Sequence, residues 1–232
     1  MAEVIIPLDY ATGEEALDLV EVLGSACDFY KVGLELFSRE GPRVVEALTQ
    51  RDKRVFLDLK LHDIPNTVAR SVSAARDLGV DFLTVHTTGG GPMMAAAAES
   101  AGGEVTLLGV TVLTSMAVSD VEAVWNRELG SLRDEVVRLA GLAKTAGVGG
   151  VVASPMEVRP LKRLVGSDLL VVTPGIRLAG DDHHDQARVA TPEAAAEAGA
   201  DYLVVGRSIT RAADPVKALA LVRSQAEAGS TA

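Results

Sequence analysis

The chain has 232 residues, of which 48% are hydrophobic and 23% charged, and it carries a formal net charge of −10. This composition is typical of one large or two small well-packed domains and excludes an intrinsically disordered protein. The negative charge and an aromatic content of 3% disfavour non-specific nucleic-acid binding, so an anionic ligand would have to be held by local lysines, arginines and backbone N–H groups.

Short apolar runs alternate with Ala-, Leu- and Glu-rich segments of helical length along the whole chain. The apolar runs predict strands at Val4–Leu8, Phe29–Val32, Val55–Leu61, Phe82–His86, Thr106–Val112, Gly150–Ala153, Leu169–Thr173 and Tyr202–Val205. The segments between and after them predict helices at Glu14–Leu23, Pro42–Gln50, Asn66–Leu78, Pro92–Ser100, Leu132–Thr145, Met156–Leu164, Pro192–Ala198 and Pro215–Ala226. Regular alternation of strands and helices predicts a parallel sheet.

The number of strand–helix units and the chain length fit a closed (β/α)₈ TIM barrel, formed by one α/β domain that spans residues 1–232. The main alternative is an open doubly wound sheet, which usually carries a glycine-rich phosphate-binding turn after its first strand. The segment Asp9-Tyr10-Ala11-Thr12-Gly13 does not supply that turn, which favours the barrel. No linker divides the chain, and only the tail Ala228–Ala232 is expected to be loose.

The third predicted strand concentrates charge on one of its two faces. Because side chains alternate along a strand, its valine and leucines are expected to pack beneath the helices, while Phe56, Asp58 and Lys60 share the opposite face. A second carboxylate, Asp63, follows just after the strand. Such a group of charges is costly unless the charges neutralise one another or take part in chemistry.

The reactive groups of a (β/α)₈ barrel lie at the carboxyl ends of its strands. A structural ion pair would account for Asp58 and Lys60 taken alone, since structural networks also perturb titration. One salt bridge suffices for structure, however, so the additional charges Asp9, Lys31 and Asp63 at neighbouring strand ends favour an active site.

Two further segments bear on ligand binding. The turn Val205–Ser208 offers glycine, backbone N–H groups and the guanidinium of Arg207, which suits a phosphate, although an ordinary turn with a solvated arginine is the alternative. The polar segment Leu178–Gln186 is expected to form a mobile lid. Its adjacent His183 and His184 rarely converge on one ion in such a loop, so we predict no metal site.

Several blocks of sequence resemble the orotidine 5′-phosphate decarboxylase family. The central block, Asp58-Leu59-Lys60-Leu61-His62-Asp63-Ile64-Pro65, matches the family pattern D-x-K-x-x-D-I. The other blocks follow in family order over nearly the whole chain: Leu8-Asp9, Tyr30–Gly33, Val112–Ser115, Val172–Arg177, Asp185–Arg188 and Val205–Ser208. The doublet His183-His184 is not a recognised family element.

The resemblance implies an enzyme that converts orotidine 5′-monophosphate to uridine 5′-monophosphate and carbon dioxide, without metal or cofactor. It implies that Lys60 donates the proton to C6 of the pyrimidine, that Asp58 lies beside the departing carboxylate, and that Asp63 acts at the partner subunit's site. The other residues that it implies in substrate binding are Asp9 and Lys31 at the ribose, Thr114 and Ser115 at the base, Gln186, Gly206, Arg207 and Arg177 at the phosphate, Thr67 toward the partner's site, and Ile64 and Pro174.

The resemblance also implies a homodimer with shared active sites. Two alternatives stay open at this point: a magnesium-dependent sugar-phosphate decarboxylase or synthase of the same superfamily, and a non-catalytic nucleotide sensor on the same scaffold. The single Cys27 fits a reducing cytosol, and no signal peptide or transmembrane segment is recognisable. We therefore expect a cytoplasmic protein that binds neither nucleic acid nor membrane.

Overall fold

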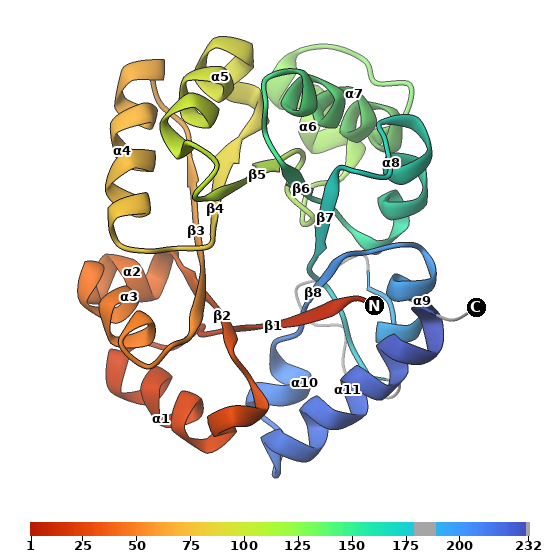
Figure 1. Cartoon of the computed structure of the whole chain (residues 1–232). Helices are drawn as coiled ribbons and strands as arrows, with labels where there is room; N and C mark the ends of the chain where they lie inside the picture. Colours follow the sequence, from red (N-terminus) through yellow and green to blue (C-terminus); the bar gives the residue numbers. More distant parts are fainter. Residues whose placement is uncertain (179–188, 231–232) are drawn as a thin grey trace.

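The computed structural model describes residues 1–178 and 189–230. In this part of the chain, eight strands close a barrel in the order β1 to β8, with the helices arranged around it (Figure 1). Every neighbouring pair is parallel, and the pairing of β1 with β8 closes the ring. The strands are β1 (Glu3–Pro7), β2 (Phe29–Gly33), β3 (Arg54–Leu61), β4 (Phe82–His86), β5 (Thr106–Val110), β6 (Gly150–Val152), β7 (Leu170–Thr173) and β8 (Tyr202–Val204). The predicted TIM barrel is confirmed.

The helices around the barrel are α1 (Gly13–Leu23), α2 (Leu34–Glu40), α3 (Pro42–Thr49), α4 (Pro65–Asp77), α5 (Gly90–Ala101), α6 (Val118–Trp125), α7 (Leu132–Thr145), α8 (Val158–Leu164), α9 (Pro192–Glu197), α10 (Arg207–Thr210) and α11 (Pro215–Ser230). Short 3₁₀ turns occur at Gly24–Ala26, Thr87–Gly89 and Pro155–Glu157. Hydroxyl groups cap three helices, because the side chains of Thr12, Ser131 and Thr191 accept the N–H three residues further on, at 3.3, 3.0 and 3.2 Å.

Two features of the helices differ from the prediction. The prediction of one helix per strand was wrong, because α2, α6 and α10 are additional helices of 7, 8 and 4 residues, too short to give a clear apolar period. The loose tail was wrong for residues 228–230, which continue α11. Gly229 is buried against α9, where a Cβ would collide with the carbonyl oxygen of Glu193, so tertiary packing holds this last turn.

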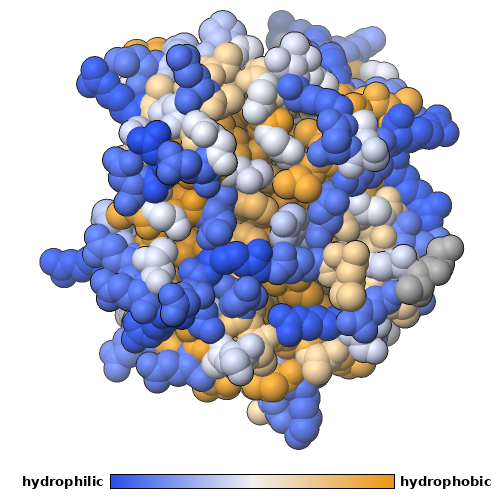
Figure 2. All heavy atoms as spheres, viewed as in Figure 1, coloured by the Kyte–Doolittle hydropathy of each residue, from blue (hydrophilic) through white to orange (hydrophobic). Residues whose placement is uncertain are grey.

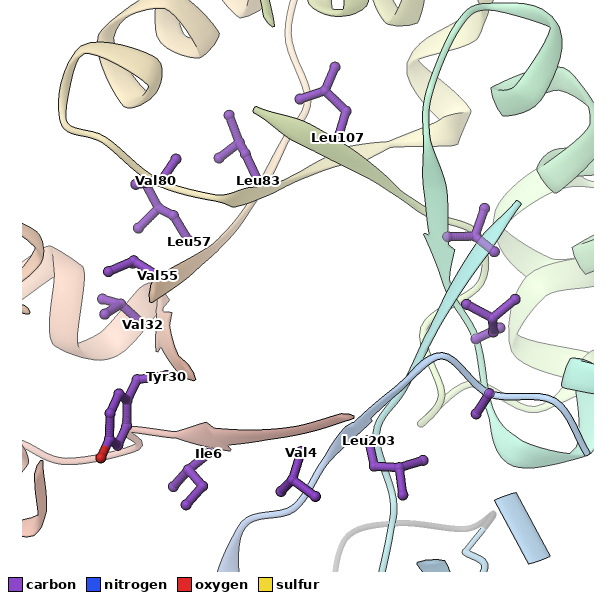
Figure 3. Packing of buried hydrophobic residues seen from close by; sticks show 14 of the residues in the cluster. Val4, Ile6, Tyr30, Val32, Val55, Leu57, Val80, Leu83, Leu107 and Leu203 are labelled. Carbon is purple, nitrogen blue, oxygen red and sulfur yellow. The ribbon is translucent and has the colours of Figure 1, made fainter. Parts of the chain in front are cut away.

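The hydrophobic core has two parts, separated by the wall of the barrel. In the outer part, side chains of the strands point away from the barrel centre toward the helices, as Figure 3 shows for Val55, Leu57 and Ile6. The inner part fills the barrel and consists of Ile5, Phe29, Phe56, Phe82, Leu108, Val172 and Val204. The predicted alternation along β3 is confirmed here, since Phe56 belongs to the inner part and its neighbours on either side to the outer part.

On the face seen in Figure 2, the periphery formed by the helices is largely polar. Figure 2 shows hydrophilic side chains over most of the periphery, with apolar side chains visible between them toward the middle of this face. Among the helices that the structure describes, none is both long enough and apolar enough to cross a membrane.

Candidate active site

A cavity of about 700 Å³ lies at the carboxyl ends of the strands. Its apolar wall includes Phe56, Val110, Val152 and Val204, which continue the inner core upward along the strands. Its charged wall consists of the cations Lys31, Lys60, Arg177, Arg207 and Arg211 and the anions Asp9, Glu15 and Asp58. Among the described residues, the cations that line the cavity therefore outnumber the anions, although the chain as a whole has a net charge of −10. This local excess suits an anionic ligand.

The charges nearest the barrel axis form an alternating row. The ammonium of Lys60 lies 2.9 Å from both carboxylate oxygens of Asp58. The ammonium of Lys31 lies 3.8 Å from Oδ2 of Asp58 and 3.2 Å from Oδ1 of Asp9. The side chains of Lys31 and Asp58 are only 13% and 14% exposed, whereas that of Asp9 is 69% exposed. The row therefore runs from solvent into the cavity with opposite charges adjacent, which lets them share one partly desolvated region.

The arrangement of the strands brings the residues of the row together. Asp58 and Lys60 come from β3, Lys31 from β2, and Asp9 follows β1, so three adjacent strands bring these residues to one edge. Gly33 makes room for the row, because a Cβ at that position would lie 3.1 Å from Nζ of Lys31. Parallel strands in register place their carboxyl ends side by side, which is why residues distant in sequence meet here.

A second group of cations lies where the loops after β7 and β8 reach the cavity. Arg177 is buried, and its Nη1 donates a hydrogen bond to the carbonyl of Ile176 at 2.8 Å. Gly206 precedes the short helix α10, which begins with Arg207. All three line the same cavity as Lys60. Two guanidinium groups at this end match the fork geometry that binds a phosphate.

The prediction missed several side chains of the cavity, among them Tyr10 and Arg211. Tyr10 lies between this cationic end and Asp9, and burial, Glu15 and Asp9 together raise the pKa of its phenol, against opposing effects of Thr210 and Arg211. The phenol is therefore a neutral hydrogen-bonding group. Arg211 lies one helical turn after Arg207, and that spacing is the only signal in the sequence that could have placed it here.

The loop between β5 and α7 carries Thr114 to the cavity and is anchored by a buried carboxylate. Glu135 is 4% exposed and binds the guanidinium groups of Arg127, at 2.7 Å, and Arg138. Burial raises the pKa of Glu135, but the hydrogen bonds from Arg138 and Arg127 outweigh it and leave that pKa below its ordinary value. Arg127 also stacks on the ring of Trp125 at 5.3 Å, so it ties helix α6 to α7.

Comparison with known proteins agrees with this geometry. The sequence pattern of the orotidine 5′-phosphate decarboxylase / HUMPS family matches residues 2–222. The chain belongs to this family. An orotidine 5′-phosphate decarboxylase of Sodalis glossinidius is 46% identical, over 97% of this chain and 90% of the relative, and one of Chromobacterium violaceum is 48% identical, over 93% and 88%. The crystal structure of orotidine 5′-phosphate decarboxylase from Lactobacillus acidophilus has a TM-score of 0.86 and 38% identity, covering 97% of this chain and 99% of that one.

The family motif residues fall into three groups by position. The residues that line the cavity are Asp9, Lys31, Asp58, Lys60, Thr114, Pro174, Arg177, Gly206 and Arg207. Those exposed at the rim and absent from the cavity lining of this single chain are Asp63, Ile64, Thr67 and Ser115. Gln186, with most of the predicted lid, lies outside the described residues. The roles of all these residues toward a substrate stay predictions.

The carboxylates of the candidate active site are not arranged around a common point where a metal ion could bind. Within residues 1–178 and 189–230, no group of three or more His, Cys, Asp or Glu side chains could hold a metal ion. The doublet His183-His184 lies outside those ranges. Near the cavity, Asp58 is occupied by two lysines, and Asp63 turns back to accept the N–H of Ile64 at 2.6 Å.

Proposed function

We propose that this chain is an orotidine 5′-monophosphate decarboxylase, which converts orotidine 5′-monophosphate to uridine 5′-monophosphate and carbon dioxide in pyrimidine biosynthesis. The observation that carries the proposal is the alternating row of Asp9, Lys31, Asp58 and Lys60 in a cavity whose other end is cationic. Membership of the family and full-length relatives of that name support it. We expect the enzyme to work in the cytoplasm.

The chemical problem is the electron pair that carbon dioxide leaves on C6 of the pyrimidine. That pair occupies an in-plane orbital which the ring delocalises poorly, so a fixed electrostatic environment has to stabilise it. An ammonium about 4 Å from the developing anion contributes about 4 kcal/mol at an effective dielectric of about 20, compared with about 1 kcal/mol net for an ordinary hydrogen bond. We propose that the Lys60 ammonium provides this stabilisation and then transfers its proton to C6, with no metal or cofactor taking part.

Asp58 has two roles in this proposal. Its carboxylate holds the Lys60 ammonium through both oxygens, which fixes the position of the proton donor before the substrate binds. It also lies beside the substrate carboxylate, where repulsion between the two anions would be relieved as carbon dioxide departs. Lys31 and Asp9 complete the row and bind the ribose hydroxyls.

The remaining contacts hold the parts of the substrate that do not react. We propose that Arg177, Gly206 and Arg207, together with Gln186, bind the phosphate, and that Thr114 and Ser115 bind the base with Pro174 against it. The phosphate is a dianion remote from C6, so its binding energy can be used to close the segment 178–186 and to exclude water from the charged row.

We further propose that two copies of the chain share their active sites. Asp63 and Thr67 are exposed beside the cavity rather than inside it, and Ile64 between them is 66% exposed, which suits residues that reach a neighbouring subunit. Mixing the inactive variants Lys60→Ala and Asp63→Asn tests this arrangement. In a mixed dimer one site regains both native residues, so random exchange should restore roughly a quarter of the wild-type activity. Additive, near-zero activity would contradict shared sites.

The decisive test of the activity is direct. Purified protein is mixed with orotidine 5′-monophosphate in EDTA, and the loss of substrate absorbance is followed together with the release of carbon dioxide. Turnover in EDTA supports the proposal. Turnover of a keto-sugar phosphate only when magnesium is added would instead identify the sugar-phosphate enzyme, and tight nucleotide binding without carbon dioxide release would identify a sensor.

A further inference from the structure

The backbone of Lys60 is unusual for a residue in a strand. Its φ angle is +51°, in the left-handed region that disfavours any residue with a Cβ. The pairing of β3 with β4 is irregular at the same place, since Leu57 pairs with Leu83 but Leu61 pairs with Val85. The extra residues of β3 form a bulge, and bulges redirect side chains next to active sites. The Lys60 side chain thus owes its direction to a distorted backbone that something has to hold.

Thr84 of β4 provides that support. It is fully buried, and its Oγ1 accepts the backbone N–H of Lys60 at 2.8 Å. The same hydroxyl donates to Oδ1 of Asp58 at 3.0 Å. Thr84 is absent from the residues that line the cavity, so it reaches the reaction only through these two neighbours. One buried hydroxyl therefore joins the main chain of the proton donor to the carboxylate that holds its ammonium.

We propose that Thr84 is a positioning residue for the decarboxylation, an inference that rests on the function proposed above. Asp58 Oδ1 accepts from both the Lys60 ammonium, at 2.9 Å, and Thr84, so the carboxylate cannot rotate without losing one of them. The Lys60 N–H, displaced from the regular ladder by the bulge, is satisfied by the threonine side chain instead. Without the hydroxyl, both the backbone of Lys60 and the carboxylate of Asp58 are free to move, and the ammonium loses its alignment with C6.

If Thr84 had a purely structural role, its loss would affect stability but not the chemical step. Thr87 offers a matched control that distinguishes the two roles. Thr87 lies just beyond β4, is 1% exposed, and donates its hydroxyl to the backbone carbonyl of Val110 at 2.9 Å. Thr84→Val and Thr87→Val each remove one buried hydroxyl from the same region without changing the shape of the side chain. Both variants should therefore lose thermal stability, whereas only the first should affect the chemical step.

The experiment measures kcat and KM with orotidine 5′-monophosphate for wild type, Thr84→Val, Thr84→Ser, Thr84→Ala and Thr87→Val. We expect kcat of Thr84→Val to fall by about 10- to 100-fold, the loss typical of a hydrogen bond to a charged group, with KM changed less than about threefold. Thr84→Ser should recover most of the loss, and Thr87→Val should keep kcat within about twofold. If Thr84→Val does not fold, the pair Thr84→Ser and Thr84→Ala, which differ by one oxygen atom, makes the same comparison.

Crystal structures of the same variants provide a readout that does not depend on activity. Displacement of the Asp58 carboxylate or relaxation of the Lys60 φ angle in Thr84→Val, but not in Thr84→Ser, supports the proposal. Unchanged positions of both residues, wild-type kcat in Thr84→Val, or equal losses in Thr84→Ser and Thr84→Ala would each overturn it. A wild-type protein that does not decarboxylate the substrate would overturn the proposed function, while the structural comparison would still decide the role of Thr84.

Discussion

The interior of the barrel has two ends of opposite character, although the same strands build both. At the amino-terminal ends of the strands, Phe29, Phe56, Phe82 and Tyr202 form an aromatic plug with edge-to-face contacts, such as 5.1 Å between the ring centres of Phe29 and Phe82 and 4.9 Å between those of Phe82 and Tyr202. At the carboxyl ends, the charged row lines an open cavity. Only one residue, Leu57, separates Phe56 of the plug from Asp58 of the row.

The residues that stabilise the fold and the residues that give it an activity therefore lie at different ends of the barrel. Aromatic rings packed edge-to-face stabilise the folded state and close one end of the barrel. Partly desolvated charges do not favour folding in themselves, so the charged row depends on stability supplied elsewhere. The guanidinium of Arg54 lies 4.3 Å above the ring of Phe29, so this charge covers the plug from outside. Changes at the two ends should therefore have separable effects.

The largest effect is expected at the charged end. Lys60→Ala should lower kcat by at least about 1,000-fold, because it removes both the proton donor and an interaction of about 4 kcal/mol with the developing anion. The fold should persist, since the side chain points into the cavity and not into the core. Steady-state kinetics and circular dichroism check both parts.

Lys53→Ala is the matched control for Lys60→Ala. The Lys53 ammonium donates to the carbonyls of Gly24 and Cys27, at 2.6 and 2.9 Å, and does not line the cavity. This variant should lose stability but keep kcat. Near-normal decarboxylation by Lys60→Ala would rule out the role assigned to that lysine.

In the aromatic plug, a substitution is expected to lower stability while leaving activity nearly unchanged. Phe82→Ala removes the ring that contacts Phe29, Phe56 and Tyr202, and should lower the free energy of unfolding by about 3–5 kcal/mol. At a temperature where the variant is folded, kcat should remain within about threefold of wild type. Urea unfolding and kinetics at that temperature measure the two quantities. Val124→Ala, at a side chain that is 69% exposed, is the control and should change neither.

A loss of kcat in Phe82→Ala without a loss of stability would contradict the separation of the two ends. It would mean that the plug shapes the charged row through Phe56, the one ring that belongs to the plug and also lines the cavity.

Much of the charged end could be predicted from the sequence because strand periodicity and position carry the information. Once Val55–Leu61 is assigned as a strand, alternation places Phe56, Asp58 and Lys60 on one face, and the barrel topology brings the ends of its neighbours beside them. The fold follows from the same alternation of short apolar runs and helices. These inferences depend only on local pattern and on the short list of ways to close a parallel sheet.

The contacts that hold the site residues in position could not be predicted in this way. Thr84 is a β-branched residue in a buried strand, and strand propensity alone accounts for a threonine at such a position. Nothing in the sequence therefore distinguishes Thr84 from Thr106 or Thr173. The bulge at Lys60 depends on how β3 pairs with β4, which is a tertiary property. The helical conformation of residues 228–230 likewise depends on a contact between distant elements.

A smaller effect is expected at the phosphate end of the cavity. Arg207→Ala should raise KM by about 10- to 100-fold, the loss typical of a charge-assisted hydrogen bond, with a smaller change in kcat. Stability should change little, because Arg207 lines the cavity at the start of a four-residue helix. Initial-rate kinetics measure the effect, and Arg163→Ala, on the exposed surface of α8, is the control. An unchanged KM would count against this end as the phosphate site.

The smallest effect is expected at His86, which lies on β4 just behind the charged row. Its ring stacks on that of His62 at 5.3 Å, and its Nδ1 lies 3.0 Å from the hydroxyl of Thr88. Burial lowers the pKa of His86, and the positive charges of His62 and Lys60 lower it further. A histidine whose pKa is lower in the folded than in the unfolded state binds fewer protons when folded. Its contribution to stability is therefore complete above about pH 6.5 and is lost as the pH falls through the lowered pKa.

His86→Gln tests this sign, because glutamine retains a polar partner for Thr88 but does not titrate. Between pH 8 and pH 5, urea unfolding should show the wild type losing more free energy of unfolding than the variant, with the difference arising below about pH 6.5. His62→Gln removes one of the two neighbours whose electrostatic interaction lowers the pKa of His86, and should therefore weaken the dependence without abolishing it. Parallel curves for wild type and His86→Gln would mean that His86 titrates alike in both states, and that neither burial nor the neighbouring His62 and Lys60 lowers its pKa.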